Sequence, residues 1–134
     1  MGHWQEIDHT ADLALHMWAA DLPDLFATAA RGMFSLLTPL AGLATDATVD
    51  VALAALDVET LLVDWLNELL YLSEVGEVAF VDFGFEQLTP TALAATARGG
   101  VMVERLNYIK AATFHNLAVV RTRQGYETEI VFDT

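Results

Sequence analysis

Two segments with apolar residues at helical spacing constrain the fold most strongly, because each begins just after an aspartate that can cap a helix. The first segment follows Asp21 and ends at Pro39, with Pro23 near its first turn. The second follows Asp57 and carries a broad apolar stripe: Leu61, Leu62, Trp65, Leu66, Leu69 and Leu70. We therefore expect two amphipathic helices.

Elsewhere the chain shows the two-residue alternation of apolar side chains that is typical of β-strands. Six segments show it: 13–18, 49–53, 81–85, 93–97, 117–122 and 126–132. The last two flank Gln124 and Gly125, which predict a tight hairpin. Two helices and about six or seven strands predict an α+β fold of two layers, in which the helices pack on a largely antiparallel sheet.

The length of 134 residues fits one domain over residues 1–134, and neither a repeat nor a linker interrupts it. Cysteine is absent, which excludes disulfides, thiolate metal sites and cysteine nucleophiles. The N-terminus lacks the basic and apolar regions of a signal peptide, and no segment is long and apolar enough to span a bilayer. We expect a soluble, cytoplasmic protein.

The formal net charge of −13 argues against a nucleic-acid-binding domain. Gripping phosphates requires a basic patch, whereas the six Lys and Arg residues are scattered along the chain. We expect no direct, tight binding to RNA. The acidity is suited to a basic protein partner or a cation, although it could equally serve only to keep the chain soluble.

Two acidic segments could hold a metal. The first runs from Asp8 through His9 to Asp12, and its oxygen and imidazole donors suit calcium, magnesium or manganese, and permit zinc. The second is the end of the chain, where Asp133 and the terminal carboxylate of Thr134 place two anionic groups side by side. Ordinary alternatives are a turn that satisfies backbone groups and a frayed, solvated terminus.

Two further segments, the second helix and the stretch from Lys110 to His115, carry charged or titratable residues that could be functional. Asp64 and Glu68 share one face of the second helix, where like charges repel unless a cation or a basic partner intervenes. Lys110 is the only lysine and could neutralise a carboxylate cluster, and His115 could be a ligand or a base. The alternatives are ordinary structural roles. Asp64 and Glu68 could lie on a solvated helix face, Lys110 could form a surface ion pair, and His115 could be a partly buried histidine with its hydrogen bonds satisfied. No arrangement of nucleophile and base is recognisable.

Taken together, four segments resemble the archease family over residues 4 to 134. They are Asp8–Asp12, Leu62–Tyr71, Ile109–Leu117 and Val131–Asp133. The resemblance implies a protein that assists RtcB-type RNA ligases in tRNA splicing or RNA repair, by promoting guanylylation and turnover of the ligase. It also implies a metal site at Asp12 and Asp133 with Thr134 beside them, and functional roles for Asp64 and Lys110. Relatives often end in Asp-Ile, so Thr134 departs from the pattern.

The hypothesis that follows is an accessory protein and not an enzyme, whose acidic residues handle a divalent metal in the active site of the ligase. Two rivals remain open. A stand-alone metal-dependent hydrolase could use the same carboxylates on a phosphoester. A chaperone-like interaction module would leave the carboxylates incidental.

Overall fold

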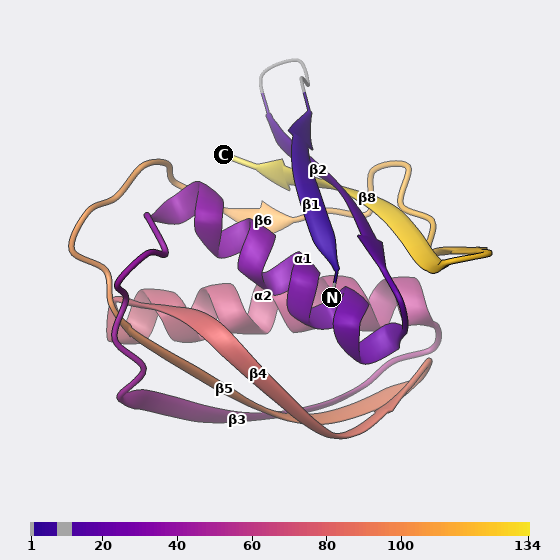
Figure 1. Cartoon of the computed structure of the whole chain (residues 1–134), viewed down its shortest axis with the longest axis horizontal. Coiled ribbons are helices and arrows are strands. Elements are labelled where there is room, and N and C mark those ends of the chain that lie inside the picture. The colour runs from indigo at the N-terminus through magenta and orange to yellow at the C-terminus, as the bar shows by residue number, and fades with distance from the viewer. Residues whose placement is uncertain (1, 8–11) are drawn as a thin grey trace.

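The computed structural model describes residues 2–7 and 12–134. Two helices and eight strands are present within these residues (Figure 1). They follow in the order β1 (His3–Ile7), β2 (Leu13–Ala19), α1 (Leu22–Leu37), β3 (Ala47–Ala54), α2 (Val58–Gly76), β4 (Val78–Thr89), β5 (Ala92–Val101), β6 (Ala111–Ala112), β7 (Val120–Thr122) and β8 (Gly125–Asp133). The predicted α+β class, with antiparallel strand pairing, is confirmed.

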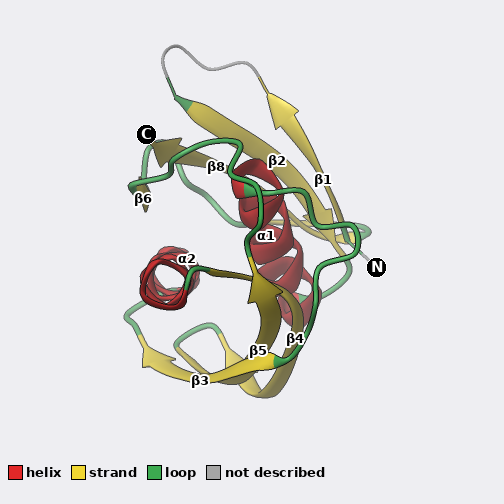
Figure 2. Cartoon of the chain, turned by 90° about the vertical axis from the view of Figure 1, so that its left-hand side faces the viewer, coloured by secondary structure: helices red, strands yellow, loops and turns green. Residues whose placement is uncertain are grey.

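The strands form two antiparallel sheets, whereas the sequence predicted one. The larger sheet has five strands in the order β1-β2-β8-β6, with β7 also paired to β8, and the smaller has the order β3-β5-β4. Figure 2 shows α1 between the two sheets, and residues Leu25 to Ala30 of this helix are all buried, as expected for a helix covered on two sides. Alternation identifies the buried face of a strand but not its neighbours, which explains the difference.

Both helices begin where the sequence predicted. The Asp21 carboxylate accepts a hydrogen bond from the Asp24 N–H, and the Asp57 carboxylate accepts one from the Thr60 N–H, both over 2.8 Å. Hydrogen bonds from the side chain and the N–H of Thr60 hold the pKa of Asp57 below its ordinary value. Neither of the described helices is long and apolar enough to cross a membrane.

Trp65 fixes α2 against the rest of the core. Its side chain is fully buried, and its indole N–H donates to the Phe26 carbonyl of α1 over 3.0 Å. The rings of Phe83 and Phe85 in β4 pack on it, with centroids 5.8 and 5.4 Å away. Asp64 and Glu68 lie on the flank of α2 and are half-buried.

The predicted hairpin is confirmed, although its first strand is shorter than expected. Thr122 pairs with Gly125, whose φ of +136° favours glycine. Residues 117–119 leave the strand because they bond elsewhere. The Val119 N–H donates to the Glu59 carboxylate over 3.0 Å, and the Ala118 carbonyl accepts from the Thr128 hydroxyl over 2.8 Å.

Asp24 ties the beginning of the chain to α1. Its carboxylate accepts hydrogen bonds from the N–H groups of Gly2 and Ala20 over 2.7 and 3.0 Å. Burial raises the pKa of Asp24, but the hydrogen bonds lower it by more than burial raises it. The pKa therefore lies below the ordinary value of 3.8.

Candidate functional site

The pairing of β2 with β8 brings Asp12 and Asp133 together from opposite ends of the chain. Its register places Leu13 opposite Phe132. This is the last pair of the ladder. Asp12 is the residue just before Leu13 and Asp133 is the residue just after Phe132, so both adjoin the same end of the strand pair. Asp12 is half-buried and Asp133 is exposed. In Figure 2 the C-terminus accordingly lies beside the start of β2.

The segment that contains β6 braces the end of β8. The Lys110 N–H donates to the Asp133 carbonyl over 2.8 Å, and Ala111 pairs with Asp133. Two residue pairs further along, the N–H and the hydroxyl of Thr113 both donate to the Val131 carbonyl, over 3.0 and 2.9 Å. The backbone of Asp133 is therefore held in place while its carboxylate remains exposed.

Asn67 of α2 attaches β6 to the helix. Its side-chain carbonyl accepts from the Ala112 N–H over 2.8 Å, and its amide donates to the Ala112 carbonyl over 3.2 Å. The side chain thus pairs with both backbone groups of Ala112, much as a neighbouring strand would. Through β6 it positions both Lys110 and Asp133.

Asp64 and Lys110 lie on two neighbouring surface depressions of α2. Asp64 lines one together with Glu68, and Lys110 lines the other. Asn67 and Tyr71 border both depressions, so the two adjoin each other. The structure therefore places these two predicted residues on one surface, separate from Asp12 and Asp133 but connected to Asp133 through the backbone N–H of Lys110.

His115 lies on a connecting segment. His115 is exposed in the turn after β6, where its N–H donates to the Thr113 hydroxyl over 3.3 Å, and its Nε2 lies 3.4 Å from the Asn116 amide. Asp8 and His9 lie outside the described residues.

The donors at the end of β8 are chemically suited to a divalent metal, which the family resemblance implies. Paired carboxylates are ligands that calcium, magnesium and manganese prefer. Within residues 2–7 and 12–134, no group of three or more His, Cys, Asp or Glu residues is arranged to hold a metal. Asp12 and Asp133 would thus need further oxygen donors from Thr134, water or a partner, and this metal site stays a prediction.

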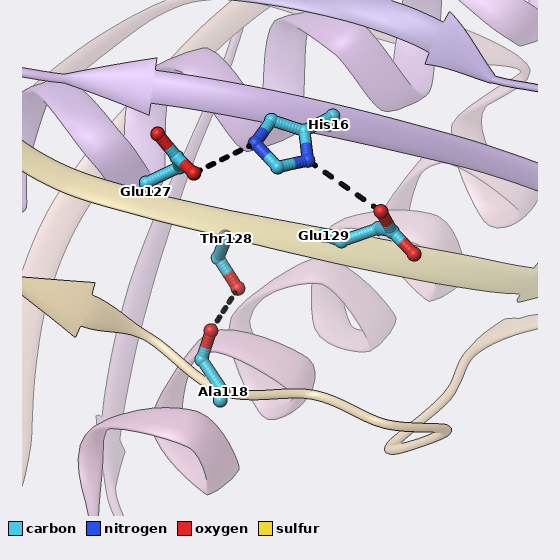
Figure 3. A network of polar contacts seen from close by, with 5 residues as sticks. All are labelled: His16, Ala118, Glu127, Thr128 and Glu129. Carbon is cyan, nitrogen blue, oxygen red and sulfur yellow. Dashed lines mark hydrogen bonds and ion pairs between the residues drawn. The ribbon is translucent and has the colours of Figure 1, made fainter.

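A polar network on the outer face of the five-stranded sheet was not predicted from the sequence. Figure 3 shows His16 of β2 between Glu127 and Glu129 of β8, with its ring nitrogens 3.2 and 3.5 Å from their carboxylates. The ring of Trp18 packs beside His16, with centroids 4.6 Å apart. Alternation alone groups His16 with Trp18, but only the pairing of β2 with β8 supplies the two glutamates.

Comparison with known proteins identifies the family. A profile of the Archease protein family matches residues 4–134. The chain belongs to the archease family. Its archease relatives include proteins from Archaeoglobus fulgidus, with 34% identity covering 95% of this chain and 96% of the relative, and Methanosarcina barkeri, with 31% identity covering 97% and 94%.

Solved structures agree with this archease fold. The solution structure of protein 1598 from Methanobacterium thermoautotrophicum superimposes with a TM-score of 0.81 at 25% identity, and covers 98% of both chains. An archease from Thermotoga maritima, described as a possible chaperone, gives a TM-score of 0.69 at 23% identity, covering 97% of this chain and 96% of the other. The latter likeness concerns the fold alone.

Proposed function

We propose that this archease-family chain is an accessory protein of an RtcB-type RNA-splicing ligase, promoting guanylylation and turnover of the ligase without being an enzyme itself. The observation that supports the proposal is that Asp12 and Asp133 each adjoin the last residue pair, Leu13 and Phe132, at one end of the ladder between β2 and β8. These two residues and Thr134 form the acidic tip. The resemblance assigns them to metal handling, and the position of both aspartates at the same end of the strand pair supports this assignment.

The way the acidic tip is held suits work inside a partner. The hydrogen bond from Lys110 fixes the Asp133 backbone, so the carboxylate can be presented without being buried. Asp12, Asp133 and Thr134 would hold a divalent cation there through oxygen donors, and the cation would supply positive charge to a nucleotide phosphate. Asp64 and Lys110 would contact the ligase beside the tip.

Charge supports a protein-mediated role over direct RNA binding. Six basic residues against nineteen acidic ones give the chain a strong net negative charge, which opposes binding to a phosphate backbone. The ligase would contact the RNA, while the acidic chain would approach a positively charged surface of the ligase. The proposal also places the chain in the cytoplasm.

The test is guanylylation of a purified ligase by GTP, with and without this chain. Asp12→Asn and Asp133→Asn remove one charge each with little change in size, and Asp46→Asn is a matched control at an exposed loop position. We expect each tip variant to lose at least about tenfold in stimulation, as is common when one charged group in a reacting site is removed. The control should match the wild type, and all three should melt at similar temperatures. Full stimulation by both tip variants would contradict the proposal.

The same proteins separate the two rival functions. A stand-alone hydrolase would turn over a phosphoester with manganese in the absence of any ligase. A chaperone-like module would bind its partner equally well after Asp133→Asn or in the presence of a chelator. If either result is found and adding this chain leaves guanylylation of the ligase unchanged, the corresponding rival is favoured over the proposed function.

A further inference from the structure

Two adjoining depressions lie on the surface along α2. Two depressions of about 400 and 290 Å³ adjoin each other along the helix and share Asn67 and Tyr71. Together they form the α2 groove. In Figure 2 the helix lies between β6 and β3, and Ala111 of β6 and Leu53 of β3 also line the groove. Both depressions open to solvent, so a partner can reach the groove.

Negative charge dominates the α2 groove. Asp64, Glu68 and Glu74 line it, against one ammonium group from Lys110. Within residues 2–7 and 12–134, none of the three carboxylates forms an ion pair. Asp64 and Glu68 are four residues apart on the helix, a spacing at which like charges repel. A positively charged occupant would relieve this repulsion, whereas an anionic one would add to it.

Aromatic rings accompany these charges. Tyr71 and Tyr108 are 63% and 58% exposed, which is unusual for side chains with so much apolar surface. Leu70 and Ile109 are buried beneath them. An arginine side chain can stack its guanidinium group on such a ring while it donates to a neighbouring carboxylate, which a lysine does less well. Tyrosines of this kind are common at the energetic centre of interfaces.

A second copy of this chain is a poor candidate for the occupant. Each copy carries a net charge of −13, so two copies repel each other. The six Lys and Arg residues of the chain are also spread over its length. Charge complementarity thus favours a different, basic protein segment.

We propose that the α2 groove binds an arginine- or lysine-bearing segment of the ligase. This inference rests on the proposed function, because the ligase is the partner. The groove ends at Lys110, whose N–H holds the Asp133 backbone, so a docked segment would lie next to the acidic tip. Docking in the groove sets the affinity for the ligase, and the acidic tip sets the extent of stimulation.

The experiment titrates the ligase with full-length variants and follows guanylylation. One variant combines Glu68→Lys with Glu74→Lys. Its control combines Asp46→Lys with Glu86→Lys, which makes the same change in net charge at exposed positions away from α2. Glu86 belongs to β4, at the sheet edge opposite β3. We expect the groove variant to need at least about tenfold more protein for half-maximal stimulation, with the maximum unchanged. The control should shift less than about twofold.

The other possible outcomes would each contradict a different part of the proposal. Equal shifts in the groove variant and the control would overturn the docking site, leaving only a general effect of charge. A lower maximum without a shift would also overturn it, because the groove would then act in stimulation. Self-association of the wild type that disappears in the groove variant would assign the groove to a second copy. Absence of any stimulation by the wild type would instead refute the proposed function, and this inference with it.

Discussion

Replacing Asn67 by alanine tests whether the side chain that joins α2 to β6 positions the acidic tip. The substitution removes two hydrogen bonds to Ala112, of 2.8 and 3.2 Å. Ala112 is only 5% exposed, so water cannot fully replace the lost partners. We expect β6 to detach from the helix, and Lys110 and Asp133 to lose their placement with it.

The magnitude follows from those two bonds. Each contributes about 0.5–1.5 kcal/mol net, and leaving a buried backbone group without a partner costs about 1–3 kcal/mol. We therefore expect the Asn67→Ala variant to lose about 2–3 kcal/mol in the free energy of unfolding. For a chain of this size, that loss lowers the melting temperature by roughly 8–12 °C.

Thermal unfolding and amide hydrogen exchange provide the measurements. The control is Gln87→Ala, which truncates an exposed amide on β4 and should cost less than about 0.5 kcal/mol. Exchange of the Lys110 and Ala112 amides should accelerate in the Asn67 variant and not in the control. The reasoning is refuted if the two variants melt together and these amides stay equally protected.

Two further predictions concern stability. Because the pKa of Asp24 is lowered in the folded chain, its carboxylate stabilises the fold above the ordinary pKa of 3.8, and this contribution is lost as pH falls through the folded pKa. The difference in unfolding free energy between wild type and Asp24→Asn should thus be largest near neutral pH and shrink below about pH 4; a difference independent of pH in denaturant titrations would contradict this. Glu77 ends α2 with a φ of +54°, a conformation that costs a non-glycine residue about 1 kcal/mol. Glu77→Gly should raise the melting temperature by a few degrees, and a fall would show that the Glu77 side chain is needed.

Helix positions could be predicted from the sequence because their determinants are local. Asp21 and Asp57 cap the helices they precede, and each bonds to an N–H three residues later. By contrast, β1 and β6 were not predicted. β6 is only two residues long, and it exists because Asn67 and β8 supply its hydrogen bonds. Such a strand has no pattern of its own to detect.

The candidate site was only partly accessible from the sequence. Asp12 and Asp133 were joined by the family resemblance, since nothing local to either residue indicates that β2 pairs with β8. His16 was missed for the same reason, because its partners Glu127 and Glu129 come from that strand. The α2 groove also needed the structure, because Lys110 and Tyr108 approach the helix from a distant segment. Long-range pairing, which periodicity does not specify, accounts for all three.

The central claim is that Asp12 and Asp133 act as one site on the ligase. A double-mutant cycle tests it, with guanylylation measured at saturating concentrations of wild type, Asp12→Asn, Asp133→Asn and the double variant. If the two carboxylates form one unit, the double variant should stimulate about as poorly as either single variant. Losses that multiply in the double variant would show that the two aspartates act independently, and would contradict the account.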